Sequence, residues 1–269
     1  MLNSIFAKTL RDSRSGIVWW GLGVGSLALL VGLLYPAWRD NAASLQSFLE
    51  SFLDTVPPAF TTMFGFNQDL FTLQGWADIE LLVYLPLLLA IATIAACSGA
   101  FAGEEDQGTL DLLLSQPVER WRVGLEKFAA VTLATLAATV IVLIFFVGGL
   151  AAANVPFDVG RVILATFNGV PLALLMGALA LFGSALFPSR GLAVVVPAAL
   201  LTASFFLDSF AQVIDSLRAV RRLSLYYYYA ASKPLTGSLE WGHVALLLGL
   251  TVVFLLAGLW AFERRELRV

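Results

Sequence analysis

Residues that could carry out chemistry are scarce in this sequence. His243 is the only histidine and Cys97 the only cysteine among 269 residues. A metal site built on several histidines, a second histidine for a proton relay and an intramolecular disulfide are therefore excluded by count. Ser98, Ser184 and Ser204 could each face His243 in a serine–histidine pair, but no neighbouring residue marks one of them as an activated nucleophile.

The lysines do not form a phosphate-binding loop. ATP hydrolysis by the usual fold needs a glycine-rich loop that ends in Gly-Lys-Ser/Thr. The three lysines, Lys8, Lys127 and Lys233, follow alanine, glutamate and serine. We therefore expect no catalytic residue, no metal and no bound ATP in this chain.

One pair of acids is similar to a pair found in an enzyme class. Glu104 and Glu105 resemble the paired glutamates of membrane-embedded CAAX-type proteases. That class expects an arginine four residues after the second glutamate and further histidines in the spans. Position 109 is Thr109, so the sequence argues against an intramembrane protease.

The elements that position these residues are predicted to be transmembrane helices. Hydrophobic residues make up 59% of the chain and charged residues 13%, against about 25% charged in soluble domains. The mean hydropathy is +0.85. A spanning helix needs roughly 20 apolar residues, which predicts an all-α, polytopic integral membrane protein with residues 1–269 as one transmembrane domain. The six predicted spans are 17–37, 79–102, 128–153, 162–187, 192–207 and 244–262.

The distribution of basic residues predicts the orientation. With the N-terminus in the cytoplasm, the inside segments hold ten of the 16 lysines and arginines. The first apolar run is longer than a signal-peptide core, so we expect an uncleaved span. The expected location is the inner (cytoplasmic) membrane, with both termini in the cytoplasm. No basic tract with interleaved aromatic residues suggests nucleic-acid binding.

Three further segments are predicted to be structured. Residues 1–16 have an apolar face typical of a helix lying in the inner interface. Apolar residues between Leu45 and Val56 recur with helical spacing, which predicts an amphipathic helix on the outer side. The outer loop 208–241 contains the run Tyr226–Tyr229, which favours anchoring in an interfacial aromatic belt over contact with a substrate.

The loop at 103–127, between spans two and three, has its own helical signals. Thr109 can cap a short helix, and Asp111 would lie in its first turn. Leu110, Leu113 and Leu114 form an apolar stripe. Such a helix is too small to fold alone, so it docks either into the groove of a partner or against the ends of its own spans.

The stretch from Glu104 to Arg122 resembles the cytoplasmic loop of type-2 ABC exporter permeases. The matching residues are Glu105, Asp106, Gly108, Thr109, Leu110, Asp111, Leu112, Leu113, Pro117, Arg120, Trp121 and Arg122, with Lys127 shortly after them. Two further matches are the segment Leu223–Tyr228 with Pro234-Leu235, and the ending Phe262–Leu267. The resemblance covers the whole chain, although the outer segment 45–56 is larger than in minimal members.

The resemblance implies a permease subunit that works with separate ATPase subunits. In the family, a coupling helix in this loop sits in a groove of the ATPase. The residues carried over as ATPase-coupling residues are Glu105, Asp106, Gly108, Thr109, Leu110, Leu113, Leu114, Pro117 and Arg120. The implied partners are two cytosolic ATPases, which hold ATP and Mg, and a second permease copy, identical or not, in the lipid bilayer.

Two other classes of function remain as alternatives. An ion-coupled secondary transporter needs ionisable groups in the middle of the membrane. Glu80 and His243 lie near the predicted outer ends of spans, where interface positions are favoured over substrate contact. This scarcity argues against proton coupling and suits a hydrophobic or amphipathic cargo. The second alternative is a membrane scaffold that transports nothing.

Overall fold

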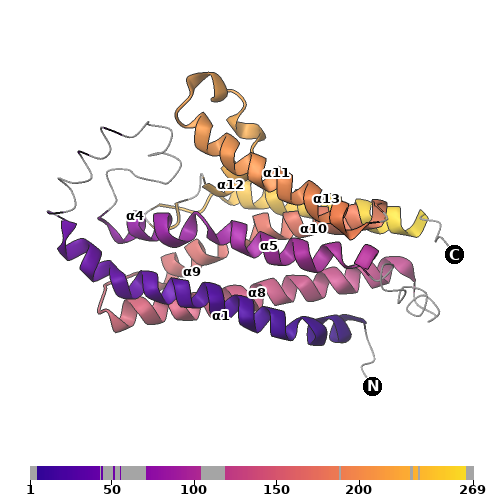
Figure 1. Ribbon diagram of the computed structural model, residues 1–269, viewed down its shortest axis with the longest axis horizontal. Helices are drawn as coiled ribbons and strands as arrows, with labels where there is room; N and C mark the ends of the chain where they lie inside the picture. Colours follow the sequence, from indigo (N-terminus) through magenta and orange to yellow (C-terminus); the bar gives the residue numbers. More distant parts are fainter. Residues whose placement is uncertain are drawn as a thin grey trace.

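The computed structural model describes residues 5–42, 44, 51, 55, 71–103, 119–187, 189–230, 233–235 and 237–264. Within these ranges the chain forms helices joined by turns and contains no strand, which confirms the predicted all-α class. The helices run roughly along one axis of an elongated bundle (Figure 1).

Six stretches of helix are long and apolar enough to cross a membrane, as the sequence predicts. They are α1 (Ile5–Asp40); α4, η1 and α5 (Leu73–Ala77, Asp78–Leu82 and Leu85–Ser98); α8 (Arg120–Ala152); α9 and α10 (Val159–Phe167 and Val170–Leu186); α11 (Arg190–Ala211); and α13 (Trp241–Arg264). Between α11 and α13 lie the short elements η2 (Asp215–Leu217), η3 (Arg221–Leu223) and α12 (Leu225–Ala230).

Several helices extend past the predicted spans. Residues 5–16 of the predicted interfacial segment form the first part of α1, which continues without a break into the first span. The third span begins at Arg120, well before the predicted start at Phe128, and the fifth continues past residue 207 to Ala211. The predicted amphipathic segment Leu45–Val56 lies outside the described residues, apart from Ser51 and Thr55.

Two spans contain interruptions that the apolar pattern does not reveal. The second span includes the π-helical turn η1, which is followed by a turn before α5. The fourth is divided at Asn168-Gly169, and Pro171 lies in the first turn of α10. The Asn168 side-chain amide donates to the carbonyl of Tyr229 at 3.2 Å. The polar side chain at the break therefore satisfies a backbone carbonyl of a neighbouring segment.

Helix α10 forms the centre of the bundle. In the stretch Val159–Leu186, 78% of the most apolar window is buried, whereas the value for α13 is 22%. Leu172, Leu175, Met176 and Leu181 of α10 are fully buried. The Thr93 hydroxyl donates across to the carbonyl of Ala173 at 2.7 Å, which joins α5 to α10. The outer faces of α11 and α13 expose valines and leucines, as expected for surfaces that meet lipid.

Helix α1 packs along α8 at a distance that two glycines permit. A Cβ atom on Gly32 would lie 2.7 Å from the backbone nitrogen of Leu150. One on Gly149 would lie 2.5 Å from the carbonyl oxygen of Leu29. Small residues at such a crossing let two membrane helices approach closely. The pair α1–α8 thus forms one edge of the bundle (Figure 1).

The start of α1 and the end of α13 lie at the same end of the bundle (Figure 1). The C-terminal end of α5 and the start of α8 also lie there. We call this the loop end, because the segment 104–118 begins and ends at it. The short helices between α11 and α13 lie at the opposite end.

Candidate functional site

The candidate site is the loop end, where the predicted coupling segment joins the bundle. Eight of the nine predicted coupling residues lie outside the described residues; these are Glu105, Asp106, Gly108, Thr109, Leu110, Leu113, Leu114 and Pro117. The ninth, Arg120, lies within the described residues. It is the first residue of α8, and its side chain is half-buried. The structure therefore describes the frame to which the two ends of the segment are attached.

The beginning of the segment is attached to α10 and α8. The amides of Phe101 and Ala102 both donate to the hydroxyl oxygen of Ser184, each at 3.0 Å. The ammonium of Lys127 donates to the carbonyl of Ala100 at 2.5 Å. All five residues are buried. The backbone that leaves α5 is thereby satisfied by side chains of two other helices, as buried backbone groups require.

An aromatic contact attaches the same backbone to α13. The rings of Phe101 and Phe262 stack with centroids 3.8 Å apart, and both side chains are fully buried. Gly124 of α8 makes room for Phe101 and for Leu259 of α13, because a Cβ atom there would lie 2.5 Å from Leu259 Cδ2 and 2.8 Å from Phe101 Cζ. Phe101 thus fixes the start of the loop against α8 and α13 together.

Past the far end of the segment, the first turns of α8 contact α1. Glu119 precedes α8 with extended backbone, and its carboxylate accepts from the indole N–H of Trp121 at 2.7 Å. Further along α8, Glu126 forms an ion pair with Arg122 at 2.8 Å. The other oxygen of Glu126 accepts from the backbone N–H of Phe6 at 3.0 Å. The first N–H groups of a helix have no partner within it, so Glu126 caps α1 from a neighbouring helix.

These contacts connect several helices to one another at the loop end. Residues on both sides of the segment 104–118 contact α1, α8, α10 and α13 through buried or paired groups. The described residues contain no group of three or more His, Cys, Asp or Glu side chains that could hold a metal ion.

The serines considered for a nucleophile make structural hydrogen bonds. Ser184 accepts the two amides at the loop end, and the Ser98 hydroxyl donates to the carbonyl of Ala95 at 3.2 Å. The hydroxyl of Ser204 accepts from the amide of Leu225 at 3.4 Å. The His243 ring packs against Tyr227 and Tyr228, and its Nδ1 is buried without a hydrogen-bond partner. This arrangement supports no serine–histidine chemistry.

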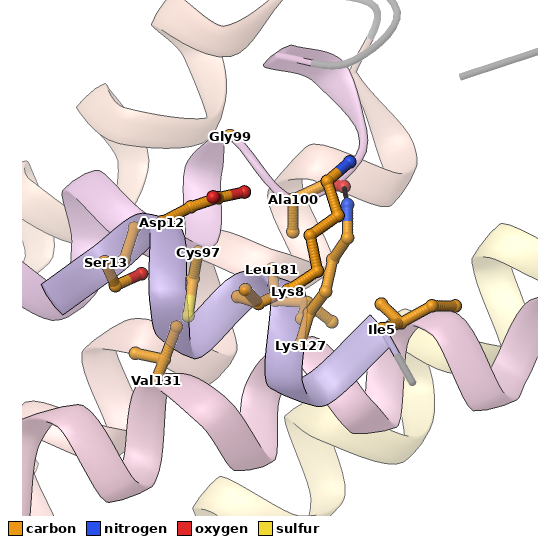
Figure 2. Close-up of a pocket in the computed structure, with 12 residues that line it drawn as sticks. Ile5, Lys8, Asp12, Ser13, Cys97, Gly99, Ala100, Lys127, Val131 and Leu181 are labelled. Atoms are coloured by element: carbon orange, nitrogen blue, oxygen red, sulfur yellow. Dashed lines mark hydrogen bonds between the residues drawn. The ribbon is translucent and has the colours of Figure 1, made fainter. Parts of the chain in front are cut away.

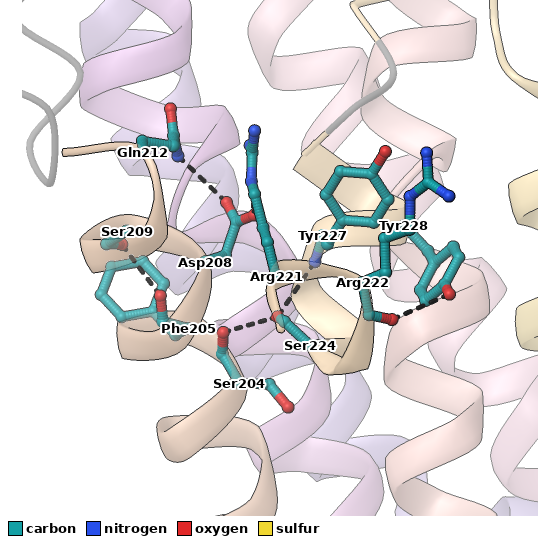
Figure 3. Close-up of polar contacts among 10 residues, drawn as sticks. All are labelled: Ser204, Phe205, Asp208, Ser209, Gln212, Arg221, Arg222, Ser224, Tyr227 and Tyr228. Atoms are coloured by element: carbon teal, nitrogen blue, oxygen red, sulfur yellow. Dashed lines mark hydrogen bonds and ion pairs between the residues drawn. The ribbon is translucent and has the colours of Figure 1, made fainter. Parts of the chain in front are cut away.

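A second polar cluster lies at the opposite end of the bundle, and sequence reasoning missed it. Asp208 of α11 is 1% exposed and forms an ion pair with Arg221 at 2.8 Å (Figure 3). The side-chain amide of Gln212 donates to its other oxygen at 3.1 Å. The hydroxyl of Ser224 donates to the carbonyl of Ser204 at 2.6 Å. The predicted end of the fifth span at 207 placed Asp208 in a loop, although a lone acid next to so apolar a run could have suggested a buried pair.

The tyrosines of the run 226–229 differ in their burial at that end. Tyr226 and Tyr229 are buried, and their hydroxyls donate to the carbonyls of Val83 and Leu82, at the end of η1. Burial raises the pKa of both phenols, so they remain hydrogen-bond donors. Tyr227 and Tyr228 are only partly buried. The predicted aromatic belt therefore does not describe Tyr226 and Tyr229, which satisfy backbone groups freed where the second span changes its helical pitch.

A comparison with protein families identifies a match. The family model described as "ABC-2 family transporter protein" matches residues 4–267. The comparison with curated proteins found no match. The match covers nearly the whole chain, including the loop end and all six candidate spans.

Proposed function

The chain belongs to the ABC-2 family of transporter proteins, and from this premise we propose that it is the permease subunit of an ATP-driven exporter. Membership of this family makes it the membrane component of a transporter and not itself a catalyst. The proposal adds the direction of transport, the source of energy and the kind of cargo. The cargo is a hydrophobic or amphipathic molecule, in keeping with spans that carry few ionisable residues.

The observation that supports this proposal is the attachment of both ends of the segment 104–118. Ser184 and Phe262 hold the backbone just before it, while Glu126, on α8 beyond its far end, contacts α1. These contacts give the segment a frame on both sides. A coupling segment needs one, because a force applied to it must reach the spans.

The complete transporter requires partners. Two cytosolic ATPase subunits would hold ATP and Mg, and a second permease copy, identical or not, would complete the pathway. The leucine stripe Leu110, Leu113 and Leu114 would enter a groove of the ATPase, with Glu105, Asp106 and Arg120 around it. In this arrangement both termini lie on the cytoplasmic side of the inner membrane.

Transport in reconstituted vesicles tests the proposal. We expect flux of an amphipathic cargo to require ATP and the ATPase subunit, and to continue when the proton gradient is collapsed. Equal flux with and without the ATPase would contradict the proposal. Flux that stops with the proton gradient would favour an ion-coupled transporter, and no flux under any condition would favour a scaffold.

Substitutions in the segment test the contact itself. The double variant Leu110→Asp/Leu113→Asp places two charges in the predicted apolar stripe, so the ATPase should no longer co-purify with the permease. Leu112→Asp is the matched control, because helical spacing puts residue 112 outside the stripe. Retention of the ATPase by the double variant would contradict the assigned contact.

A further inference from the structure

A groove between α1 and α5, with α8 as its floor, has a charged end and an apolar end. The charged end is a cavity of about 160 Å³ at the loop end, lined by Lys8, Asp12 and Lys127, among others. The apolar end is a cavity of about 420 Å³ lined by Trp20, Ile91 and mostly small side chains. The two cavities share Asp12, Ser13, Ala96 and Val131 in their walls, so they are continuous parts of one groove.

The groove exists because small residues face it. Ala92, Ala95 and Ala96 of α5 lie opposite Ala134 and Ala138 of α8. Helix α1 packs closely on α8 but meets α5 at few positions, so their side chains do not close the space. The groove is open to the surroundings, since Ile91 is 51% exposed and Ala95 and Ala96 are also exposed. In a membrane this opening faces acyl chains.

Basic side chains outnumber acidic ones among the described residues that line the charged end. Figure 2 shows the side chains of Lys8 and Lys127 both directed toward Ala100, with Asp12 on the other side of the cavity. Lys127 is 6% exposed and is held in place by the Ala100 carbonyl, whereas Lys8 is exposed at the mouth. Two ammonium groups against one carboxylate leave one positive charge among the residues that line the cavity. The hydroxyls of Thr9 and Ser13 add hydrogen-bond donors.

We propose that this groove binds an anionic phospholipid from the leaflet at the loop end, with its phosphate at Lys8 and Lys127 and an acyl chain along Ala134 and Trp20. Basic pockets between membrane helices bind anionic head groups in this way. The apolar cavity lies in the size range of ligand pockets, about 300–1,000 Å³. This site does not depend on the proposed ATPase contact, and its test contains no ATPase.

Fluorescence quenching of Trp20 measures occupancy of the apolar end. The indole N–H of Trp20 donates to the carbonyl of Leu88 at 3.0 Å, which holds the ring in the groove wall. The full-length protein is placed in phosphatidylcholine vesicles containing increasing fractions of phosphatidylglycerol or phosphatidylcholine brominated in the acyl chain. The quenching lost in Trp20→Phe is the Trp20 signal. We expect half-maximal quenching at a mole fraction about fivefold lower for the anionic lipid, the factor that one basic residue near an anionic head group supplies.

Two pairs of variants locate the head group and the chain. Lys8→Gln should abolish the preference for the anionic lipid, whereas Lys233→Gln, a lysine outside the groove, should keep it. Ala134→Leu fills the floor and should reduce the Trp20 quenching, whereas Ala129→Leu, on the exposed face of the same helix, should not.

Three results would overturn the proposal. They are equal quenching by the two lipids, an unchanged preference in Lys8→Gln, and unchanged quenching in Ala134→Leu. Competition by millimolar inorganic phosphate would assign the charged end to a free anion and would also contradict a lipid site.

Discussion

Ser184 shows how a single hydroxyl can hold the backbone that follows α5 in place. It lies in the last turn of α10, the molecule's most buried helix, and accepts hydrogen bonds from two consecutive amides, those of Phe101 and Ala102. Neither amide can turn to water, because both residues are fully buried. The cost of losing the acceptor is therefore the cost of leaving two buried donors without partners.

Ser184→Ala should lower the free energy of unfolding by about 1–3 kcal/mol for this reason. Thermal unfolding in detergent micelles measures the change. Ser26→Ala is the control, because the Ser26 hydroxyl is exposed and bonds the carbonyl of Gly23 in its own helix. Equal effects of the two substitutions would show that Ser184 has no special role at the loop end.

Asp208 and Arg221 form a buried ion pair, which behaves differently from an exposed one. The Asp208 side chain is 1% exposed and that of Arg221 30%, so removal of Arg221 leaves a carboxylate unpaired in a poorly solvated place. Arg221→Ala should cost about 3–5 kcal/mol of stability. Arg39→Ala removes the arginine of the exposed pair Arg39–Asp40 and should cost about 1 kcal/mol or less. A small effect of Arg221→Ala in the same unfolding measurement would contradict the role of this pair in holding η3 against α11.

At the scale of helices, the contact between α1 and α8 depends on glycine at defined positions. Gly149 faces the backbone of α1 and has no room for a side chain, whereas its neighbour Gly148 has open space around it. Gly149→Val should destabilise the protein by about 1–3 kcal/mol through overpacking. Gly148→Val makes the same chemical change in the same helix, so it serves as the control. Equal unfolding temperatures for the two variants would contradict the close packing of α1 on α8.

The number and order of the spans could be predicted from sequence, because runs of about 20 apolar residues are long enough to cross a bilayer and longer than most buried core helices. The residues at which the spans begin and end could not be predicted in this way. The charges of Lys127 and Asp208 suggest loop positions, yet both residues lie inside helices. The ammonium of Lys127 donates to the carbonyl of Ala100, and the carboxylate of Asp208 pairs with Arg221. The break at Asn168 is also invisible in the pattern, because its partner, the carbonyl of Tyr229, lies far away in the sequence.

The family could be predicted from the sequence, whereas the contacts around the candidate site could not. The motif from Glu105 to Arg122 and the tail beginning at Phe262 pointed to the family that the comparison then confirmed. Nothing in the motif indicates that Ser184 and Gly124 contact the residues just before it. Their roles depend on contacts between residues that lie far apart in the chain, and a single sequence does not reveal such contacts.

In the molecule as a whole, different kinds of contact hold the two ends of the bundle together. The loop end attaches a connecting segment to α1, α8, α10 and α13, while the opposite end attaches α12 to η1 through tyrosine hydroxyls. A force applied at the loop end would therefore reach the opposite end through packed helices, with α10 at their centre. Rigid-body rocking of two such permease halves is the motion that we expect ATP hydrolysis to drive.

Photo-crosslinking from the coupling segment in living cells tests the central claim most directly. A photoreactive amino acid at position 113 should crosslink to a protein that contains a Gly-Lys-Ser/Thr phosphate-binding loop, identified by mass spectrometry. The same amino acid at position 112 should give much less of this product, because it lies outside the leucine stripe. Crosslinks from position 113 that form only within the permease itself would contradict the account, since the segment would then pack on its own bundle and offer no contact to an ATPase.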